Sequence, residues 1–576
     1  MNTMILTRFL PILIIYLTLL QSSFGNDLPI YSPRARFHPV VAKNGMVVSE
    51  NKTATEAGLQ VLMEGGNAID AAVTVGFTLA ATFPRAGNLG GGGFMLIYHA
   101  DKKEVNSIDY REKAPLAAHR DMFLDKYGNV DNEKTRYSYL SIGVPGTVAG
   151  LAAALEKYGT IPLKRALRPA IELAEKGFPV YPELRRSLIE ARDRMKSSPE
   201  SMKIFYKENG DPYEAGEILK QKDLAWSLKQ IADHGPDAFY NGAIADRLVS
   251  SIKKGGGIIT KEDLANYKPV FRKPVKGNYR GYEVYSMPPP SSGGVLVIQM
   301  LNILETFPLK KSGHNTAGTI HLLVESMKLA FADRSEHLGD PDFTELKVEE
   351  LLSEYYAEEL VKKINRDIST PAQNIKPGNP LVNGGKDTTH FTVMDKYGNV
   401  VSNTYTLNFP YGSKITASGT GIILNNEMDD FSAKPGVPNA YGLVGGELNS
   451  IEPGKRMLSS MTPTIVLKDG NPFMATGSPG GGKIINTVLQ VILNVIDFEM
   501  NIAEATNAVR IHHQWLPDEV DVEEGLNKDT IWILEDKGHT VKIGNTIGSA
   551  QSIMKIGDYF YGSTDPRRPG GLASGY

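Results

Sequence analysis

The chain contains 576 residues, of which 41% are hydrophobic, so it is long enough to bury a large core. A formal net charge of −3 provides no long-range attraction to nucleic acid or to anionic membranes. The sequence has no cysteine, which excludes disulfides, a thiol nucleophile and thiolate metal ligands.

The N-terminus has the pattern of a cleavable export signal. Arg8 precedes an apolar run over residues 9–20, and Ser23 and Gly25 stand at the −3 and −1 positions of a cleavage site. An apolar run of this length is too short to span a bilayer. We therefore expect residues 1–25 to be removed as a signal peptide, which leaves a periplasmic or secreted protein without a membrane anchor.

Helical patterns dominate the first two thirds of the chain, and strand-like patterns follow. Amphipathic segments predict helices near 53–82, 147–176, 183–196, 222–233, 242–253 and 315–333, the first capped by Thr53 or Thr55. Strand-like runs lie at 390–394, 400–407, 421–424, 464–467 and 473–476, and helices near 484–498 and 502–508 follow them. The pattern predicts an α+β assembly of stacked layers, with two sheets inside two helical faces.

Two short turns predict hairpins among these strands. Residues 468–471 form a hairpin turn, and residues 395–399 read as a type I turn with Gly398 in the left-handed position, which closes a three-residue loop. If Asp395 then pairs with Asn399, Thr388 lies across from Thr406. The register thus predicts two hydroxyl groups side by side.

Several motifs resemble those of one enzyme family. The run over 388–412 resembles the signature of the γ-glutamyltransferases, which are N-terminal-nucleophile hydrolases. The match continues in the family's order at 88–94, 109–112, 425–430, 458–461 and 477–481. The resemblance implies a four-layer αββα sandwich, formed jointly by two subunits from one precursor.

The resemblance makes Thr388 the nucleophile. An N-terminal threonine carries its own base, because its α-amine titrates near ~8. Before cleavage that amine is an amide, so the Asp387–Thr388 bond must break first. The implied products are residues 26–387 and 388–576, which stay associated as a heterodimer. The competing interpretation is that Thr388 and Thr389 are ordinary β-branched strand residues.

Gly480 and Gly481 offer consecutive backbone N–H groups, which suit a tetrahedral oxyanion, and the family uses this pair in that role. A plain tight turn is compatible with the same residues. The surrounding sequence also contains G-x-x-x-x-G-K, but Ile484 stands where a Ser or Thr would hold magnesium. We therefore expect no nucleotide, no other cofactor and no metal.

A γ-glutamyl substrate carries a free α-carboxylate and a free α-ammonium, and a selective site must pair both. The candidates for binding the α-carboxylate are Arg111, Ser459 and Ser460. The candidates for binding the α-ammonium are Asn408, Glu427 and Asp430. Residues 432–450 align with a lid loop of some family members, and Tyr441 would be its aromatic cover. Taken singly, Arg111 would more often lie on the surface and Asp430 in a cap or turn. The two acids are also compatible with a cation-binding loop, but the other oxygen ligands are missing.

The sequence therefore predicts acyl transfer from glutathione or another γ-glutamyl compound to water, an amino acid or a dipeptide. The nearest alternative is a related acylase or capsule-releasing hydrolase with the same fold and nucleophile. A non-enzymatic binding protein on the same scaffold is the second alternative. It would be expected to lose Thr388 or the glycine pair, and the sequence keeps both.

Overall fold

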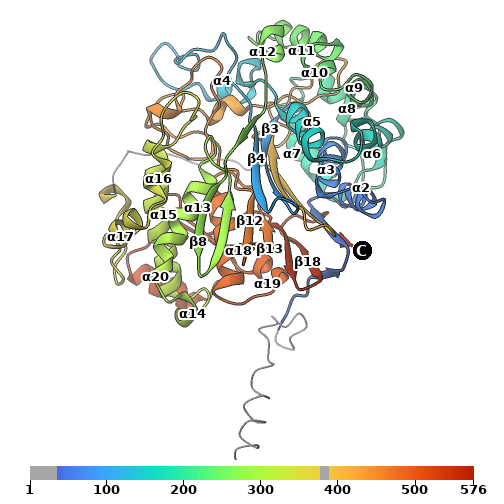
Figure 1. Ribbon diagram of the computed structural model, residues 1–576. Helices are drawn as coiled ribbons and strands as arrows, with labels where there is room; N and C mark the ends of the chain where they lie inside the picture. The colour runs from blue at the N-terminus through green and yellow to red at the C-terminus, as the bar shows by residue number, and fades with distance from the viewer. Residues whose placement is uncertain (1–34, 376–387) are drawn as a thin grey trace, which may run out of the picture.

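The structure is a computed structural model that describes residues 35–375 and 388–576. Two seven-stranded sheets lie at its centre, and helices cover the outer face of each (Figure 1). The predicted αββα sandwich is therefore confirmed. Both halves of the sequence contribute to each sheet, so the two predicted subunits share one core.

The first sheet, here the β10 sheet, is antiparallel throughout and carries Thr388 at the start of a central strand. Its strands, in spatial order, are β19 (Leu572–Gly575), β2 (Gly45–Ser49), β10 (Thr389–Asp395), β11 (Val400–Thr406), β3 (Gly92–His99), β4 (Glu104–Tyr110) and β7 (Val270–Arg272).

The second sheet, here the β13 sheet, is also antiparallel and ends next to the Gly480–Gly481 pair. Its strands, in spatial order, are β1 (Val40–Ala42), β18 (Tyr559–Thr564), β17 (Gln551–Ile556), β13 (Asn471–Thr476), β12 (Thr464–Lys468), β9 (Tyr282–Ser286) and β8 (Val275–Tyr279).

Alternation along the strands builds the layers. Val393 of β10 packs against the helices on the outer face, whereas Met394 packs between the sheets. Val401 and Val400 of β11 divide in the same way. This period of two is what a strand requires when both faces of its sheet are covered.

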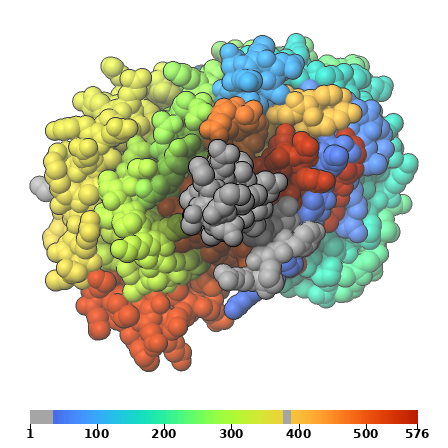
Figure 2. All heavy atoms as spheres, turned by 60° about the horizontal axis from the view of Figure 1, so that its bottom comes forward, coloured from blue at the N-terminus to red at the C-terminus, as the bar shows by residue number. Residues whose placement is uncertain are grey.

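The helices form two layers on opposite sides of the sheets (Figure 1). In the space-filling view, the teal segment around residues 150–260 and the yellow segment around residues 340–375 lie on opposite sides of the molecule (Figure 2). The layer on the β10 sheet contains α2 (Lys52–Met63), α3 (Ala68–Thr82), α5 (Thr147–Tyr158), α6 (Leu163–Lys176), α9 (Lys222–His234), α10 (Asp237–Tyr240), α11 (Ala243–Lys254) and α12 (Lys261–Ala265). The layer on the β13 sheet contains α13 (Gly293–Glu305), α14 (Leu309–Ser312), α15 (Ala317–His337), α16 (Val348–Leu351), α17 (Glu354–Val361), α18 (Lys483–Ile496), α19 (Ile502–Asn507) and α20 (Lys528–Asp536).

Smaller elements complete the described chain. They are α4 (Asn132–Tyr137), α7 (Pro182–Met195), α8 (Pro199–Phe205), the 3₁₀ turns η1 (Tyr139–Ser141), η2 (Ala372–Asn374), η3 (Glu427–Asp430) and η4 (Glu447–Asn449), the pair β5 (Phe178–Pro179) and β6 (Ile218–Leu219), and the sheet of β14 (Ile511–His512), β15 (Val520–Glu523) and β16 (Val541–Gly544). No helix in the described ranges combines the length and apolarity that crossing a bilayer requires.

The α3 helix is buried along its whole length and anchors the hairpin that follows Thr388. Asn67 and Asp70 form a capping box at its N-terminus. Ala68 N also donates to Asp395 Oδ2 at 2.7 Å, so a carboxylate of the β10–β11 turn sits at the positive end of the helix. The helix therefore fixes the far end of the hairpin.

Four sequence predictions need correction. The segment 53–82 forms two helices, and Asn51 caps the first in place of Thr53 or Thr55. The segment 147–176 also divides, into α5 and α6. The run 421–424 is not a strand, since only isolated bridges at Ile423 and Leu424 hold it. The first two thirds also contribute strands to both sheets, which the helical patterns did not predict.

Candidate active site

The β10–β11 hairpin has the predicted register. Thr389 pairs with Tyr405, which places Thr388 opposite Thr406. Gly398 adopts φ +91° in the turn, where a left-handed residue is required. Thr388 Oγ1 lies 3.5 Å from Thr406 Oγ1, at the limit of a hydrogen bond, and both residues are buried.

Glycines let the neighbouring strand approach this hairpin. A Cβ on Gly91 would lie 2.0 Å from the carbonyl oxygen of Thr406, and one on Gly93 would lie 2.5 Å from that of Thr404. Any side chain at these positions would push β3 away from β11. The glycine run therefore has the predicted role of allowing a strand close to Thr406.

Arg111 follows β4 and is completely buried among carboxylates. Its Nη1 pairs with Glu427 and its Nη2 lies 2.5 Å from Asp430 Oδ2, while Glu112 Oε2 is 3.5 Å from Nη1. Burial raises the pKa of Glu112, Glu427 and Asp430, although Arg111 opposes the shift. Glu427 Oε2 is buried and receives no hydrogen bond from a described residue. The cluster thus has acceptor capacity left over.

One narrow cavity brings together the predicted site residues. It is lined by Arg111, Thr388, Thr406, Asn408, Glu427, Asp430, Tyr441, Leu443, Ser459, Ser460, Met461, Gly481 and Ile484. Its volume is about 20 Å³, so the Arg111 ion pairs and the lid nearly fill it. Gly480 lines a neighbouring cavity of about 260 Å³ on the other side of Tyr441.

Gly480 and Gly481 follow β13 in a conformation that L side chains rarely adopt, with φ +137° and +58°. Neither N–H donates a hydrogen bond to a described residue, whereas the two carbonyls accept from Lys483 N and Ile484 N. A Cβ on Gly481 would lie 2.4 Å from Tyr441 Cδ1. Gly481 therefore brings an N–H without a partner among the described residues to the Thr388 cavity, and Gly480 brings one to the neighbouring cavity.

The loop 432–450 covers the cavity as predicted. Tyr441 donates from its hydroxyl to the carbonyl oxygen of Asn408 at 2.6 Å, and its ring packs edge-on against Phe409. Asn408 has φ +73° and donates from Nδ2 to the carbonyl of Asn426. The lid is thus held by the segment that follows Thr406, so its position is coupled to the C-terminal end of β11.

The serine pair is held from behind by a residue that sequence reasoning missed. Arg334 of α15 is buried, donates from Nε to Ser292 Oγ at 2.9 Å and from Nη2 to Ser460 Oγ at 3.4 Å. Burial lowers its pKa to about 10. Ser459 Oγ accepts from Met461 N at 3.1 Å, which leaves its own hydrogen for another partner.

Arg568 and Glu50 are further residues that sequence reasoning missed. Arg568 Nη1 donates to the carbonyl oxygen of Thr388 at 3.0 Å and pairs with Glu50 Oε2 at 3.2 Å. The two lie 518 residues apart, so no local pattern signals the pair. Asp387, the predicted residue before the cleavage point, lies outside the described residues.

His390 has the packing role predicted for it. Its ring nitrogens lie 2.8 Å from Thr404 Oγ1 and 3.0 Å from Thr392 Oγ1, and the side chain is fully buried. Burial lowers its pKa to about 3, so the ring is neutral at working pH. A neutral histidine whose two nitrogens are both engaged is not a general base for Thr388.

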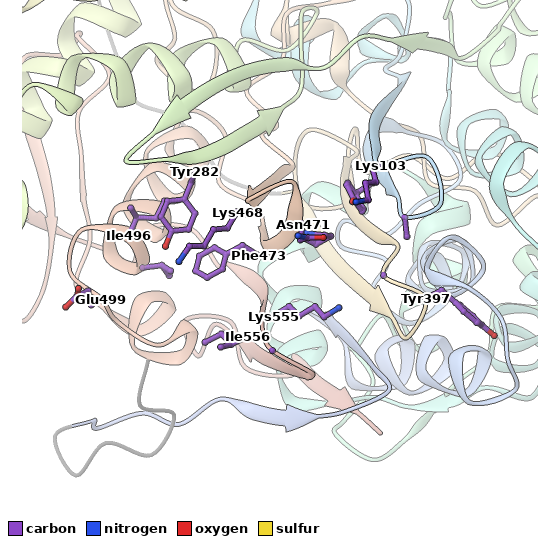
Figure 3. A pocket seen from close by; sticks show the side chains of 16 residues that line it. Lys103, Tyr282, Tyr397, Lys468, Asn471, Phe473, Ile496, Glu499, Lys555 and Ile556 are labelled. Carbon is purple, nitrogen blue, oxygen red and sulfur yellow. The ribbon is translucent and has the colours of Figure 1, made fainter. Parts of the chain in front are cut away.

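A larger cavity of about 740 Å³ does not belong to this site. It lies at the hairpin turns, at the opposite end of β10 from Thr388, and Figure 3 shows Tyr282, Lys468 and Phe473 on one side of it and Tyr397 on the other. β10 is seven residues long, which separates the two ends by about 23 Å at ~3.3 Å per residue. Cavity volume alone therefore does not identify the candidate active site.

Comparisons with known proteins agree with the motifs. The sequence matches the family profile described as gamma-glutamyltranspeptidase over residues 54–575. A glutathione hydrolase proenzyme of Escherichia coli (strain K12) is 52% identical over 541 residues, which cover 94% of this chain and 93% of that relative.

Solved structures share the fold. A cephalosporin acylase from Bacillus halodurans superposes with a TM-score of 0.84 at 30% identity, covering 96% of this chain and 99% of that chain. A gamma-glutamyltranspeptidase of Helicobacter pylori gives a TM-score of 0.57 at 45% identity, covering 62% of this chain and 100% of that chain. The chain therefore belongs to the γ-glutamyltranspeptidase family, the enzyme family that its motifs predict.

Proposed function

We propose that the protein is a self-cleaving γ-glutamyltransferase and glutathione hydrolase with Thr388 as its nucleophile. The observation that carries the proposal is the cavity that brings Thr388, Arg111, Glu427 and Gly481 together from distant parts of the chain. This cavity combines a hydroxyl, a guanidinium, a carboxylate and a backbone donor, one for each part of a γ-glutamyl amide.

Maturation is the first step. The Thr388 hydroxyl attacks the carbonyl carbon of Asp387, the peptide nitrogen leaves as the α-amine of Thr388, and water hydrolyses the resulting ester to a carboxylate on Asp387. The Helicobacter pylori chain is matched completely yet covers 62% of this chain, roughly the share that residues 26–387 make up. This coverage supports a division of the precursor at Thr388.

Turnover uses the amine that maturation releases. The α-amine takes the proton of the Thr388 hydroxyl, and Oγ1 attacks the γ-carbonyl carbon of the substrate. The N–H groups of Gly480 and Gly481 stabilise the oxyanion, and the amine returns the proton to the leaving nitrogen. Water or an acceptor amine then opens the γ-glutamyl ester. The rate should rise with pH as the α-amine loses its proton near ~8.

Substrate binding exchanges ion pairs in the cavity. The α-carboxylate of the substrate takes a place on Arg111, helped by Ser459 and Ser460, and the α-ammonium takes the acceptors of Glu427 and Asp430. Arg111 is already paired with Glu427 and Asp430. When a zwitterionic substrate binds, its carboxylate pairs with Arg111 and its ammonium pairs with the acids that Arg111 releases. The net charge buried in the cavity does not change. Uncompensated charge would be costly here, which favours zwitterionic over singly charged substrates.

The neighbouring cavity of about 260 Å³ lies where the leaving and accepting amines must pass. Tyr441 lines both this cavity and the Thr388 cavity, while Gly480 lines this one and its neighbour Gly481 lines the other. Lys483 and Lys542 also line it, and both cations are paired, with Asp521 and Glu519 respectively. Glu519 and Asp521 line the same cavity, so its two cations are matched by two acids.

A related acylase is the second candidate, because a cephalosporin acylase has the same fold. The paired charges around Arg111 argue against it, since an acyl group without an α-amino acid head would leave Glu427 Oε2 unsatisfied. The chromogenic substrate γ-glutamyl-p-nitroanilide and a cephalosporin side-chain amide distinguish the two. Release of p-nitroaniline with no acylase turnover supports the glutamyl assignment, and the reverse result refutes it.

Export completes the proposal. Residues 1–25 act as a signal peptide and the mature heterodimer works in the periplasm or outside the cell. The pattern around Arg8, Ser23 and Gly25 supports this. Fractionation of cells that express the chain, followed by mass determination of the larger subunit, tests it: a start at Asn26 in the exported fraction agrees, and a cytoplasmic subunit that keeps Met1 does not.

A further inference from the structure

We propose that His321, Glu325 and His539 form a site for a divalent transition-metal ion of the Zn²⁺ class, between α15 and the segment after α20. One nitrogen from each imidazole and one carboxylate oxygen lie within 4.8 Å of one another, and all three residues are buried. None of the three lines the cavity of Thr388. Sequence spacing did not predict the site, because the two histidines are 218 residues apart.

The fold places the three ligand side chains next to one another. His321 and Glu325 are four residues apart on α15, so their side chains leave the same face of the helix. His539 lies just past α20, where its N–H donates to the carbonyl of Leu534. The His321 Nδ1 to His539 Nε2 distance is 2.7 Å.

The second nitrogen of His321 has the partner that metal-binding imidazoles use. Its Nε2 lies 2.6 Å from the carbonyl oxygen of Asn365, which can only accept a proton, so Nε2 carries the hydrogen. The lone pair of Nδ1 is therefore directed at His539. A backbone carbonyl behind the ring is a common device for orienting a histidine ligand.

The ion pairs around Glu325 include more carboxylates than cations. Lys328 is the one cation in direct contact with Glu325 among the described residues, at 3.0 Å, and it also lies 3.5 Å from Asp518. Two carboxylates thus face this lysine, and Lys537 is a further cation that acts on His321 electrostatically.

Without a metal ion, hydrogen bonds satisfy the ligand atoms of His321, His539 and Glu325. His539 Nε2–H donates to His321 Nδ1, and Glu325 accepts from Lys328 and from Thr370 N. A metal takes the place of one hydrogen, which moves to Nδ1 of His539. Tetrahedral Zn²⁺ with Zn–N bonds of about 2.0–2.1 Å needs the two nitrogens about 3.3 Å apart, so the rings separate by roughly 0.6 Å.

A cavity gives the ion a way in. Glu325 lines a space of about 350 Å³ together with Asp333, Lys363, Thr370 and Asn374. A site with three protein ligands keeps one open position, and a water that entered this space would fill it on the side of Glu325. The cluster is thus reachable although its side chains are buried.

The effect of a bound ion on subunit association rests on the proposed function, which includes cleavage at Thr388. After cleavage at Thr388, His321 and Glu325 belong to one chain and His539 to the other. A bound ion therefore links the two subunits and stabilises their association, because it binds the assembled pair and not the separated chains.

The experiment uses the mature, untagged protein after treatment with a chelator and its removal. We expect isothermal titration with Zn²⁺ to give one equivalent per heterodimer, and Co²⁺ to give the visible absorption of a tetrahedral complex. His539→Gln should weaken Zn²⁺ binding at least tenfold. His337→Gln, on the same helix but outside the cluster, should bind like the parent. Absence of a stoichiometric Zn²⁺ site in the parent, or equal binding by the His539→Gln protein, overturns the proposal.

The uncleaved Thr388→Ala precursor separates the two proposals. It should bind Zn²⁺ as tightly as the mature protein, because the cluster does not depend on cleavage. In the mature protein, Zn²⁺ should raise the urea concentration at which the chains separate, and the His539→Gln protein should not respond. A parent that binds Zn²⁺ but never divides retains the metal site and refutes only the maturation step.

Discussion

Arg568 donates a hydrogen bond from Nη1 to the backbone carbonyl of Thr388 at 3.0 Å, and Glu50 pairs with the same guanidinium. The carbonyl belongs to the residue whose amine and hydroxyl both take part in the proposed chemistry. A hydrogen bond from a charged donor contributes about 1.5–3 kcal/mol when it is buried. The pair therefore fixes the orientation of Thr388 without lining its cavity.

Arg568→Gln is expected to lower kcat and the rate of maturation each by about tenfold or more, since about 1.4 kcal/mol corresponds to tenfold. KM for the γ-glutamyl anilide should change less than twofold, because Arg568 does not line the cavity. Arg186→Gln, in an exposed pair with Glu190, is the matched control. A large rise in KM with unchanged kcat would show that Arg568 acts on substrate binding instead.

Substitutions of the adjacent residues Thr388 and Thr389 are expected to have contrasting effects on cleavage and turnover. Thr388→Ala should abolish both cleavage and turnover, whereas Thr389→Val should cleave and turn over normally. Thr389 Oγ1 is buried with no described hydrogen-bond partner, so replacing its hydroxyl by a methyl keeps the packing of the strand. Denaturing gels and the anilide assay report the two outcomes. Cleavage of the Thr388→Ala protein into two chains would contradict the nucleophile assignment.

Gly481→Ala is expected to reduce kcat by about a hundredfold, the cost of losing one oxyanion donor. Its new Cβ would lie 2.4 Å from the Tyr441 ring at φ +58°, so the loop must shift and its N–H with it. Gly470→Ala is the control, because its φ of +74° imposes similar strain with nothing within 4 Å. Equal losses of activity in both proteins would attribute the effect to general destabilisation.

Tyr441→Phe is expected to raise the share of hydrolysis over transfer. The change removes only the hydroxyl that donates to Asn408 at 2.6 Å, so the lid opens more readily and admits water. Product analysis with and without a dipeptide acceptor measures this share. An unchanged ratio, with normal maturation, would mean that the lid does not control access of water.

Asp429→Asn is expected to change how stability depends on pH. Burial raises the pKa of Asp429 to about 6 from 3.8, so the fold disfavours its charged form. Its contribution to stability is fully present below pH 3.8 and is lost as pH rises through 6. Relative to the parent, the variant should therefore gain up to about 3 kcal/mol between pH 4 and pH 7, at ~1.36 kcal/mol per pKa unit.

Urea denaturation of the two proteins measures this difference, with the Thr388→Ala substitution in both so that each is a single chain. Arg136 is 3.4 Å from Asp429 and loses its partner in the variant, and that loss is already included in the pKa. A stability difference that is the same at pH 4 and pH 7 would contradict the assignment.

The hairpin shows what the sequence can predict. Gly398 requires a left-handed turn, the turn sets the register, and the register places Thr388 opposite Thr406. Each step depends on residues within 20 positions of one another. The motifs that resemble the family supplied the remaining members of the cavity, which local pattern alone does not connect.

The missed features depend on contacts that are distant in sequence. β3 is buried on both faces and begins with glycines, so it lacks the alternation that marks a strand. The ion pair between the two predicted residues Arg111 and Glu427 joins positions 316 residues apart, and the missed Arg334 is 126 residues from Ser460. Their charges are matched only when the fold brings them together, and a single sequence carries no record of such pairs.

The most direct test of the account is N-terminal sequencing of the smaller chain from the purified, active protein. We predict a single start at Thr388, with activity appearing at the same rate as this chain. Full activity in an undivided protein, or a smaller chain that begins at another residue, would contradict the central claim that the amine of Thr388 activates its own hydroxyl.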